Sequence, residues 1–518
     1  MPARGRVDAR TVEFEFGNSI DEGANAVLHG AALALLADDA DGLLDVVPGF
    51  RVLAVEYDPR RVDLAVLERR VRASVRAAES VEPLAPVEIP VDYAGPDLAD
   101  VATAAGLSPA EVVRIHAGRT YRVFAVGFTP GFPFLGSLDE RIRLPRRAEP
   151  RVRVEAHSVA IANAQTGIYP LASPGGWHLI GTSLVPIYDP HRAEPFLLGP
   201  GDRVRFVAAT GARPAPVEPL ELLPALPRMP ALEVIRRGVL DLVVDAGRFL
   251  AGRFGLARTG PLDAESARRA NRLLGNAAMV PVVELNLGGP VLRAVRETRV
   301  AIAGYGLTPL VGGRQVPAPC AVTLQRGDIL AFRAASRGAR CYLALPGGVQ
   351  SARHGGSVSV DVRGLIGRPL RPGDLLGQNH RWAATGAFAP ARSSTPPTLL
   401  TVRVLPGPQF EPGAWAALRG SVFTVDRADR MGIRLNGPTV PGGEVVSEPT
   451  RLGAIQVTAG GHPMILLNDR GTLGGYAKPF VVDPRDLHRV GQLRAGDAVR
   501  FRAASPLDGR GTVRITIV

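Results

Sequence analysis

The sequence has very little cysteine, no long apolar run and a polar beginning. Among its 518 residues, only Cys320 and Cys341 are cysteines, and their wide separation excludes a disulfide framework and the ligand spacing of a zinc site. No run of about 18 uncharged apolar residues occurs, so no membrane-spanning helix is expected. The arginine-rich start, residues 1–10, lacks the apolar core of a secretory signal. These absences predict a cytoplasmic protein that has no membrane partner.

Lysine is nearly absent. Lys478 is the only one, although the net charge is +12. The basic side chains are therefore arginines, and they alternate with aspartate and glutamate along the chain. No basic cluster carries the interleaved aromatic residues on which nucleic-acid bases stack. Because charge without a clustered site supplies only unspecific attraction, we expect no nucleic-acid partner.

Common cofactor and nucleophile motifs are also missing. The sequence contains no P-loop, no HExxH, no CxxC, no Gly-x-Ser-x-Gly elbow and no dinucleotide-binding glycine pattern. Lys478 lies between Ala477 and Pro479 and lacks the flanking methionines of a biotin attachment site. We therefore expect no covalently bound biotin on this chain, and the spacing of side chains identifies no metal ligands.

The apolar pattern predicts a mainly β protein that begins with an α+β unit. In the first 92 residues, strand-like alternation and helix-like spacing take turns, and the strand at 87–91 is expected to return to the same sheet. Later, short β-branched runs broken by Gly and Pro are typical of barrels or sandwiches. The predicted units are a small α+β domain at 1–92, a barrel at 93–212, a proline-rich linker at 213–230, and two further barrel units at 231–390 and 391–518, which the Pro/Ser-rich stretch 389–397 separates.

A short phrase recurs in each predicted barrel. Gly201-Asp202, Gly327-Asp328 and Gly496-Asp497 each precede an alternating strand. We predict that this turn and strand close each of the three units. The alternative is that Gly-Asp followed by apolar residues is merely a common way to enter a strand.

Two glycine-rich segments contain polar residues at turns. The first covers 127–136, and the second contains Gln165, Thr166, Tyr169 and Trp177. Glycines let the backbone approach a ligand, and the polar side chains are suited to orienting an amide substrate. The alternative is that both segments form tight corners of a barrel.

The residues around these segments resemble a known family. Residues 127–136 and 160–181 look like the first domain of the allophanate hydrolase subunit 1 family. Downstream, Asp245-Ala246-Gly247-Arg248, Thr259-Gly260-Pro261-Leu262-Asp263, residues 430–435 and residues 469–476 resemble the subunit 2 family in the expected order. The resemblance covers about Val12 to Phe501, with the subunit 1 part first. It implies a small α+β domain, a cyclophilin-like β-barrel and two further cyclophilin-like barrel units.

The same resemblance implies the B and C subunits of bacterial ATP-dependent 5-oxoprolinase, fused in one chain. It implies a small-molecule amide substrate, ATP with Mg²⁺, and a separate 5-oxoprolinase A subunit without which the chain is inactive; it leaves a homo-oligomer open. One alternative is carboxyl transfer from biotin to urea, as in urea carboxylase and urea amidolyase, with the biotin carrier on another chain. A second alternative is a non-enzymatic regulator of a histidine kinase.

Candidate site residues follow from the motifs and the resemblance. Catalytic candidates, suited to moving protons, are Asp469, Tyr476, Asp245, Asp263 and His116. Candidates for binding substrate or ATP are Gln165, Thr166, Tyr169, Trp177, Arg248, Asn271, Arg430, Arg434, Gln456 and Thr472. Each charged residue has an alternative role in a structural ion pair or a turn, and His116 has one as a buried hydrogen-bonding residue. Because neither segment is large enough to enclose a substrate, we expect residues 127–177 and 469–476 to share one cleft.

The chain departs from the family pattern at three places near these segments. The family carries Gly where this chain has His157 and Asn163, and Gln where it has Gly471. These departures bear on which substrate the site accepts.

Overall fold

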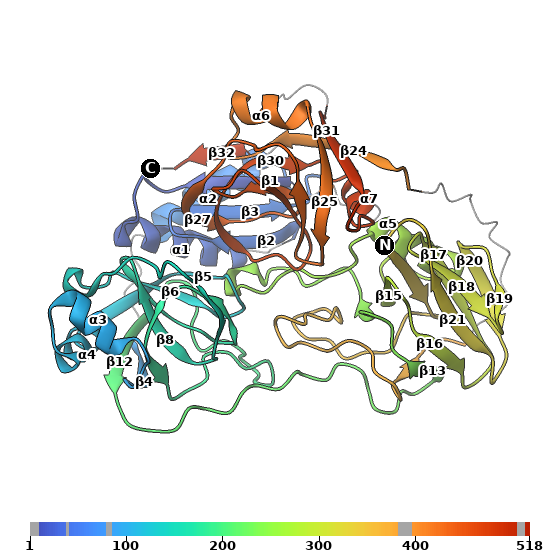
Figure 1. The fold of residues 1–518 in the computed structure, drawn as a ribbon, viewed down its shortest axis with the longest axis horizontal. Helices are drawn as coiled ribbons and strands as arrows, with labels where there is room; N and C mark the ends of the chain where they lie inside the picture. Colours follow the sequence, from blue (N-terminus) through green and yellow to red (C-terminus); the bar gives the residue numbers. More distant parts are fainter. Residues whose placement is uncertain (1–9, 38–40, 79–84, 382–395, 505–512, 518) are drawn as a thin grey trace.

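The computed structural model describes residues 10–37, 41–78, 85–381, 396–504 and 513–517. Strands dominate the described residues, and they form four lobes (Figure 1). No described helix is long and apolar enough to cross a membrane. The predicted separating stretch at 389–397 lies mostly outside the described residues.

The first unit is a sheet with two helices that contact each other. Its elements are β1 (Arg10–Glu15), α1 (Glu22–Ala37), β2 (Leu43–Pro48), β3 (Val52–Tyr57) and α2 (Leu64–Ala78). Helix α1 starts after Asp21, whose carboxylate accepts a hydrogen bond from Ala24 N–H at 2.7 Å. In α2, Leu67 and Val71 lie one helical turn apart and are fully buried in the core of this unit.

The second unit is a closed barrel with strand order β11-β4-β12-β5-β6-β9-β8. Its elements are β4 (Val87–Asp92), α3 (Leu98–Ala105), α4 (Pro109–Ala117), β5 (Thr120–Val126), β6 (Pro133–Gly136), η1 (Glu140–Ile142), β7 (Arg151–Val154), β8 (Ser158–Ala162), β9 (Gln165–Ile168), β10 (Ser173–Gly175), β11 (His178–Ser183) and β12 (Arg203–Ala208). We assigned the strand at 87–91 to the first sheet, and this was wrong. Strand β4 pairs in parallel with β12 and buries Ile89 and Val91 in the barrel core, so the barrel begins before residue 93.

The third unit consists of two sheets that share one apolar core. A six-stranded sheet runs β19-β18-β21-β16-β13-β23, and a five-stranded sheet runs β14-β15-β22-β17-β20. Pairing among the described residues does not join them into a ring. The elements are β13 (Pro230–Arg236), β14 (Leu242–Val244), η2 (Gly252–Phe254), α5 (Ala264–Leu273), β15 (Val282–Asn286), β16 (Val291–Ala294), β17 (Thr298–Gly304), β18 (Leu307–Val311), β19 (Arg314–Gln315), β20 (Cys320–Leu324), β21 (Ile329–Ala334), β22 (Arg340–Ala344) and β23 (Leu375–Gly377).

The fourth unit is a second closed barrel, in which β24 pairs with both β31 and β30. Strand β27 extends the barrel from β30. The elements are β24 (Leu399–Pro406), α6 (Pro412–Arg419), β25 (Val422–Ala428), β26 (Gly432–Asn436), β27 (Glu444–Pro449), β28 (Ala454–Val457), β29 (Pro463–Leu466), β30 (Leu473–Val482), α7 (Leu487–Val490) and β31 (Ala498–Ala503). Two of the predicted barrels are therefore closed rings, and the mainly β fold class with a leading α+β unit is confirmed.

The recurrent Gly-Asp phrase forms the same turn each time. The glycine has φ between 88° and 96°, which favours residues without a Cβ atom. The aspartate carboxylate accepts the N–H of the residue three positions earlier at 2.7–2.9 Å, before β12, β21 and β31. Gly373-Asp374 makes the same turn before β23, with φ of 89° and a carboxylate contact of 2.8 Å. The third unit thus contains two such turns. The strand after Gly327-Asp328 is β21, and β22 and β23 follow it, so β21 does not close the third unit as predicted.

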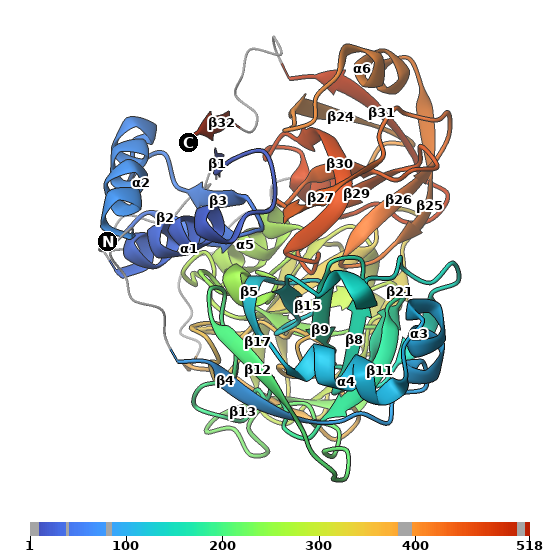
Figure 2. The same cartoon turned by 90° about the vertical axis from the view of Figure 1, so that its left-hand side faces the viewer.

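The two ends of the chain meet in the first sheet. Strand β32 (Val513–Thr516) pairs in parallel with β1 and gives the order β2-β3-β1-β32 (Figure 2). Arg514 bridges Glu13 of β1 at 2.5 Å and Glu448 of β27 at 3.0 Å. The end of the second half is therefore fastened to the beginning of the first half.

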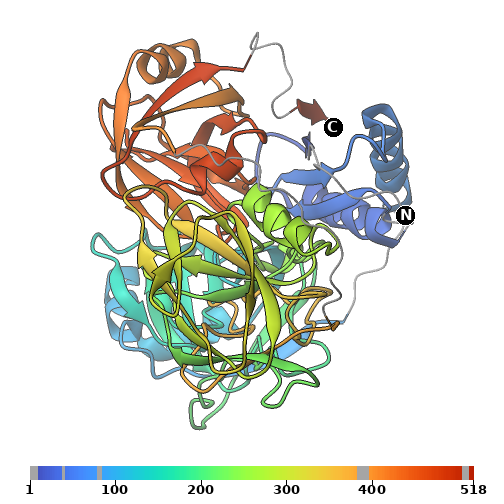
Figure 3. The same ribbon diagram turned by 90° about the vertical axis from the view of Figure 1, so that its right-hand side faces the viewer.

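The predicted linker crosses from the second unit to the third as an extended segment (Figure 1). Leu222 of this segment is buried with Leu256 and Ile366. In Figure 3 the third unit lies in front of the first barrel, which Figure 1 shows on the other side of the molecule. The linker is thus packed against the protein.

Candidate functional site

The two segments predicted to share a site meet where the first barrel contacts the last one. A Cβ atom added to Gly127 would come within 2.6 Å of the Leu473 side chain. Arg363 of the third unit donates to Phe128 O at 3.0 Å and to Asp469 O at 3.2 Å. The two segments therefore touch, as a shared cleft requires, and the cleft itself stays a prediction. We call this region the junction, and it comprises residues 127–129, 248, 361–364 and 469–473.

The junction contains four unpartnered polar atoms, and others are spread over the described residues. Arg248 Nη1, Asp361 Oδ2, Thr129 Oγ1 and Thr472 Oγ1 are buried without a hydrogen-bond partner among the described residues. An unsatisfied buried polar atom costs about 1–3 kcal/mol. A ligand or an ordered water completes such atoms in proteins.

Three of the seven described non-glycine residues with positive φ lie at or beside the junction. Phe128, Thr259 and Leu365 adopt φ values of 68°, 58° and 54°, a conformation that costs non-glycine residues about 1–3 kcal/mol each. Thr259 is β-branched and therefore an outlier. Asn468 holds it by donating from Nδ2 to Thr259 O at 2.7 Å. Strain of this kind is typical of sites that need fixed geometry.

Asp469 forms a buried ion pair and not a free acid. Arg430 donates from Nε and Nη2 to its two carboxylate oxygens at 2.7 and 3.0 Å. Burial raises the pKa of Asp469, and Arg430 opposes that shift. Because both oxygens are occupied, the geometry favours the structural alternative over proton transfer. The part of Asp469 that faces the junction is its carbonyl oxygen, which Arg363 contacts.

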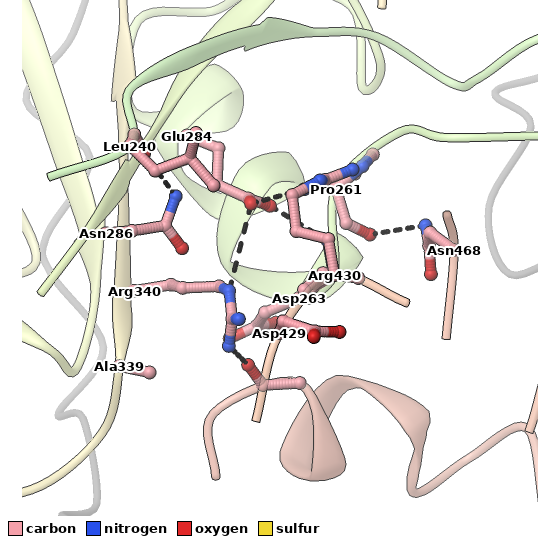
Figure 4. Close-up of polar contacts among 12 residues, drawn as sticks. Leu240, Pro261, Asp263, Glu284, Asn286, Ala339, Arg340, Asp429, Arg430 and Asn468 are labelled. Carbon is pink, nitrogen blue, oxygen red and sulfur yellow. Dashed lines mark hydrogen bonds and ion pairs between the residues drawn. The ribbon is translucent and has the colours of Figure 1, made fainter. Parts of the chain in front are cut away.

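Arg430 links the third and fourth units through Glu284. It contacts Glu284 Oε1 and donates to Gly260 O at 2.8 Å (Figure 4). Burial lowers the pKa of Arg430, but the charges of Asp469 and Glu284 outweigh this effect, and the pKa is raised above its ordinary value. Tyr342 donates to Glu284 Oε2 at 2.7 Å. Arg430 is therefore a buried connector between units, a different role from the predicted binding of a ligand.

Asp263 and Asn271 stabilise helix α5. Asp263 caps the helix by accepting from Ser266 N–H at 2.9 Å and Ser266 Oγ at 2.6 Å, and it also accepts from Gln492 at 2.7 Å. Asn271 donates to Val280 O at 3.0 Å. The predicted catalytic role of Asp263 and binding role of Asn271 are thus not supported, because these contacts occupy the polar groups of both side chains.

Asp245 and Arg248 hold the loop at 353–361. The Asp245 carboxylate accepts from the hydroxyls of Ser357 and Ser359 and from Val358 N–H at 3.1 Å. Arg248 donates to Ser359 O at 3.0 Å. Asp245 is therefore a loop anchor, whereas Arg248 still has Nη1 free of a partner among the described residues.

His116 lies inside the first barrel. Its Nε2 contacts Thr166 Oγ1 at 2.8 Å and its Nδ1 contacts the Tyr93 hydroxyl at 2.7 Å. Burial lowers the pKa of His116 to about 3, so the ring is neutral at pH 7. Phe206 stacks on the ring at a centroid distance of 4.6 Å. The predicted catalytic role is not supported for His116, nor ligand binding for Thr166, because the barrel core uses both side chains.

The aromatic candidates of the first barrel form a second cluster close to the junction. Tyr169 and Trp177 are buried with Phe132, and Leu473 of the fourth unit joins them. Burial raises the pKa of Tyr169 to about 12. Gln165 is half-buried at the start of β9. These residues form the apolar wall that supports the junction and, for Tyr169 and Trp177, match the barrel-corner alternative.

Of the remaining predicted site residues, two are exposed and two are buried. Arg434 is exposed on β26, and Tyr476 is 37% exposed on β30. Gln456 is buried on β28, with Nε2 beside Gly474. Thr472 is buried at the junction itself. Of the predicted binding residues, Arg248 and Thr472 are therefore the two that the fold brings to the junction with unpartnered atoms.

The departures from the family pattern have a physical explanation at two positions. His157 and Asn163 have φ values of 69° and 52°. Glycine adopts this left-handed conformation without strain, which is a physical reason for the glycine that the resemblance implies there. At Gly471, an added Cβ atom would lie 3.3 Å from Leu473 O and 3.6 Å from Phe128 O. A larger side chain at position 471 would therefore lie next to Leu473 and Phe128 of the junction.

Sequence reasoning missed Asp361, Arg363, Thr129 and Glu284. Thr129 lies within the glycine-rich segment that was singled out, so its position was a usable signal. Asp361 and Arg363 flank Val362 before Gly364 in a loop, a pattern that many surface turns share. Glu284 sits in the apolar strand β15, where a buried acid is itself a signal of a buried partner.

ATP and Mg²⁺ stay predictions for this chain. The described ranges contain no group of three or more His, Cys, Asp or Glu side chains arranged to hold a metal ion. We therefore derive no step through ATP at this site.

An open groove lies elsewhere. It measures about 400 Å³ between the third and fourth units, and its walls include Tyr305, Arg337, His488 and Arg494. None of the predicted site residues lines it. Arg494 donates to Ala335 O at 3.2 Å, so this groove follows the seam between the two units.

Comparison with known families gives two matches that together cover most of the chain. Residues 5–198 match the family described as carboxyltransferase domain, subdomain C and D. Residues 254–503 match the carboxyltransferase domain, subdomain A and B. The gap between the two matches, residues 199–253, contains the predicted linker at 213–230.

Individual relatives agree with this division. The 5-oxoprolinase B subunit of Escherichia coli O157:H7 is 47% identical over 174 residues, which are 33% of this chain and 79% of that protein. The 5-oxoprolinase C subunit of Haemophilus influenzae is 31% identical over 276 residues, or 51% of this chain and 88% of that protein. The urea amidolyase of Lachancea kluyveri is 32% identical over 306 residues, or 52% of this chain and 17% of that protein.

A solved structure matches both halves at once. The crystal structure of TTHA0988 superposes with a TM-score of 0.92 at 51% identity, covering 96% of this chain and all of that one. The order of the halves and their arrangement are thus shared with a second protein. The chain belongs to the carboxyltransferase-domain family that includes the B and C subunits of 5-oxoprolinase, with the B-like part preceding the C-like part.

Proposed function

We propose that this chain is a fused B and C component of an ATP-dependent 5-oxoprolinase, which opens 5-oxo-L-proline to L-glutamate together with a separate A subunit. One observation carries the proposal: relatives named as the B and C subunits of 5-oxoprolinase both match within this single chain, and the segments characteristic of each part touch at the junction. Fusion keeps the B-like and C-like parts together, so that their surfaces meet at the junction.

Lactam opening requires a more electrophilic carbonyl than the resonance-stabilised amide offers. When bound to the assembled enzyme, ATP supplies the phosphoryl group that activates the lactam oxygen. The junction contributes oriented polar atoms from Arg248, Asp361, Thr129 and Thr472 that are already desolvated. Such preorganised groups hold a substrate in one orientation and stabilise charge that develops on its oxygen.

Reconstitution tests the proposal. Purified chain, the A subunit of a 5-oxoprolinase, ATP, magnesium and 5-oxoproline are combined, and glutamate release is measured. We expect release only when both proteins are present. Robust glutamate release by the chain alone would contradict the dependence on the A subunit. No release when both proteins are present would contradict the proposed function.

Carboxyl transfer is the second candidate, because the matching family is described as a carboxyltransferase domain and a urea amidolyase is among the relatives. Its test uses a biotin carboxylase with its carboxylated carrier and urea. Urea-dependent turnover of carboxybiotin by this chain, without any 5-oxoproline hydrolysis in the first assay, would favour this second function.

A further inference from the structure

A hollow of about 640 Å³ in the fourth unit is lined mainly by arginine. Strands β24 and β31 and helices α6 and α7 contribute its walls, and all four are labelled in Figure 1. No carboxylate lies among its lining residues, and its charged ones are Arg419, Arg489, Arg500 and Arg502. We call it the arginine hollow. None of the predicted site residues and none of the junction residues lines it, so it is a separate feature of the molecule.

Three of the four arginines have no carboxylate within ion-pair distance among the described residues. These are Arg419, Arg500 and Arg502, and all three side chains are exposed. Arg500 donates from Nε to the Thr401 hydroxyl at 2.8 Å, a contact that orients the guanidinium but leaves its charge unbalanced. Positive charges gathered in one place repel each other, so an anionic partner is favoured there.

The fourth arginine has only a shared counter-charge. Arg489 reaches the Asp486 carboxylate at 3.4 Å, whereas Arg403 donates to both oxygens of that carboxylate at 2.7 and 2.9 Å. Arg489 and Pro397 also line the groove between the third and fourth units. The arginine hollow is therefore continuous with that groove, which gives an extended ligand room to continue beyond the arginines.

The surroundings of the arginines fit an extended protein segment. Val422 of β25 lies opposite Arg500 and is 55% exposed, and protein interfaces combine such apolar contacts with polar and charged ones. Arg500 and Arg502 occupy alternate positions of β31, which places them on one face about 6.6 Å apart. Alternate side chains of an extended peptide repeat at the same spacing, so two of its carboxylates match the two guanidinium groups.

Other occupants fit less well. Nucleic-acid bases stack on exposed aromatic rings, and the one aromatic residue that lines the hollow, Phe501, is only 3% exposed. A second copy of this chain carries the same net charge of +12 and the same arginines, so it is repelled. A single small anion satisfies one or two guanidinium groups and leaves the others unpaired.

We propose that the arginine hollow docks an acidic segment of a partner protein, whose carboxylates at alternate positions face Arg500 and Arg502. Further carboxylates of the same segment face Arg419 and Arg489. Arginine binds a carboxylate through two parallel N–H donors, and opposite charges on the two surfaces speed their association. This surface goes beyond the proposed function, because it contains no residue of the junction.

The test measures binding of a fluorescently labelled hexaglutamate peptide to the full chain by anisotropy. Hexaglutamine is the neutral probe of the same length, and we expect it to bind at least about tenfold more weakly. Raising the salt concentration from about 50 to about 300 mM should weaken the binding of hexaglutamate, because salt screens exposed charges.

Two double variants locate the binding. Arg500→Gln/Arg502→Gln removes two exposed ion pairs, so we expect hexaglutamate to bind at least about fivefold more weakly. Arg203→Gln/Arg205→Gln is the matched control, because these exposed arginines have the same spacing on β12, which also follows a Gly-Asp turn. It removes the same net charge, and we expect a change of less than about twofold. Arg419→Gln removes no described contact, so the roughly twofold weaker binding expected for it cannot come from a folding defect.

Each outcome supports or overturns the docking surface. Weaker hexaglutamate binding in Arg500→Gln/Arg502→Gln, with retention in Arg203→Gln/Arg205→Gln, supports it. No hexaglutamate binding, equal binding of hexaglutamine, or equal losses in the two double variants overturns it.

Two competitors identify the remaining alternatives. Displacement of hexaglutamate by millimolar inorganic phosphate at constant ionic strength marks a site for a small anion and overturns the proposal. A single-stranded oligouridine that binds more tightly than hexaglutamate, and depends on Arg500 and Arg502, assigns the hollow to nucleic acid and also overturns it. Retention of hexaglutamate against both competitors supports a protein segment as the occupant.

Discussion

Replacing Asp469 by asparagine separates the structural role of its carboxylate from a catalytic one. The carboxylate accepts two charge-assisted bonds from Arg430 in a buried setting. Removing one partner of a buried ion pair costs about 3–5 kcal/mol. Asparagine keeps one acceptor, and Glu284 remains as a counter-charge to Arg430. We therefore expect the free energy of unfolding to fall by about 2–4 kcal/mol, less than for complete loss of the partner.

The assay is thermal and denaturant unfolding of the full chain. For units of this size, each kcal/mol lowers the melting temperature by about 2–4 °C, so the melting temperature should fall by about 5–15 °C. Asp426→Asn is the control, since Asp426 is exposed on the neighbouring strand β25, and we expect a change within about 0.5 kcal/mol. Normal melting of Asp469→Asn together with a roughly hundredfold loss of turnover would refute this reasoning and restore Asp469 as a proton-transfer residue.

Three further outcomes follow from the structure. His116 has a folded pKa lowered to about 3 from 6.5, so its contribution to stability is present above pH 6.5 and is lost as pH falls toward 3. His116→Gln should reduce the pH dependence of the free energy of unfolding by about 1.4 kcal/mol per pH unit in that window. Unfolding curves of the wild type and the variant at pH 7 and pH 5 check this. If both proteins lose the same stability between these pH values, the burial of a neutral ring is contradicted. Gly127→Val should clash with Leu473 and cost about 1–3 kcal/mol, and a variant as stable as the wild type would show that the two barrels are not in contact there. Arg514→Ala should lower stability by about 1–3 kcal/mol because Glu13 and Glu448 lose a buried partner, and proteolysis of the first unit should accelerate; unchanged protection would mean that β32 does not fasten this sheet.

Local sequence patterns predicted the elements but not all of their partners. The helix-like spacing in the first 92 residues agrees with α1 and α2, and the Gly-Asp phrase predicted turns before β12, β21 and β31. The strand at 87–91 was also recognisable. Its pairing with β12 was not, because alternating burial of Ile89 and Val91 is satisfied equally well in either of two sheets. Likewise, no local signal placed β32 beside β1, almost the whole chain away.

The candidate site was located more reliably than its residues were assigned. Glycine-rich segments and the family resemblance pointed to 127–136 and 469–476, and these segments do meet. The roles of Asp469, Asp263 and His116 depend on their partners Arg430, Ser266 and Tyr93, which are 39, 3 and 23 residues away in sequence. Burial and pairing decide whether a carboxylate is an acid or an anchor, and a single sequence does not specify either.

The most direct test of the junction as the functional site uses Thr472→Val in the reconstituted enzyme. Thr472 Oγ1 is buried without a hydrogen-bond partner among the described residues, so replacing the hydroxyl by a methyl group removes no described contact and should leave the melting temperature unchanged or slightly higher. If the hydroxyl contacts the substrate, kcat/KM for 5-oxoproline should fall by at least about tenfold, in the range for a lost hydrogen bond in a site. A variant with unaltered melting and unaltered kcat/KM would contradict the account.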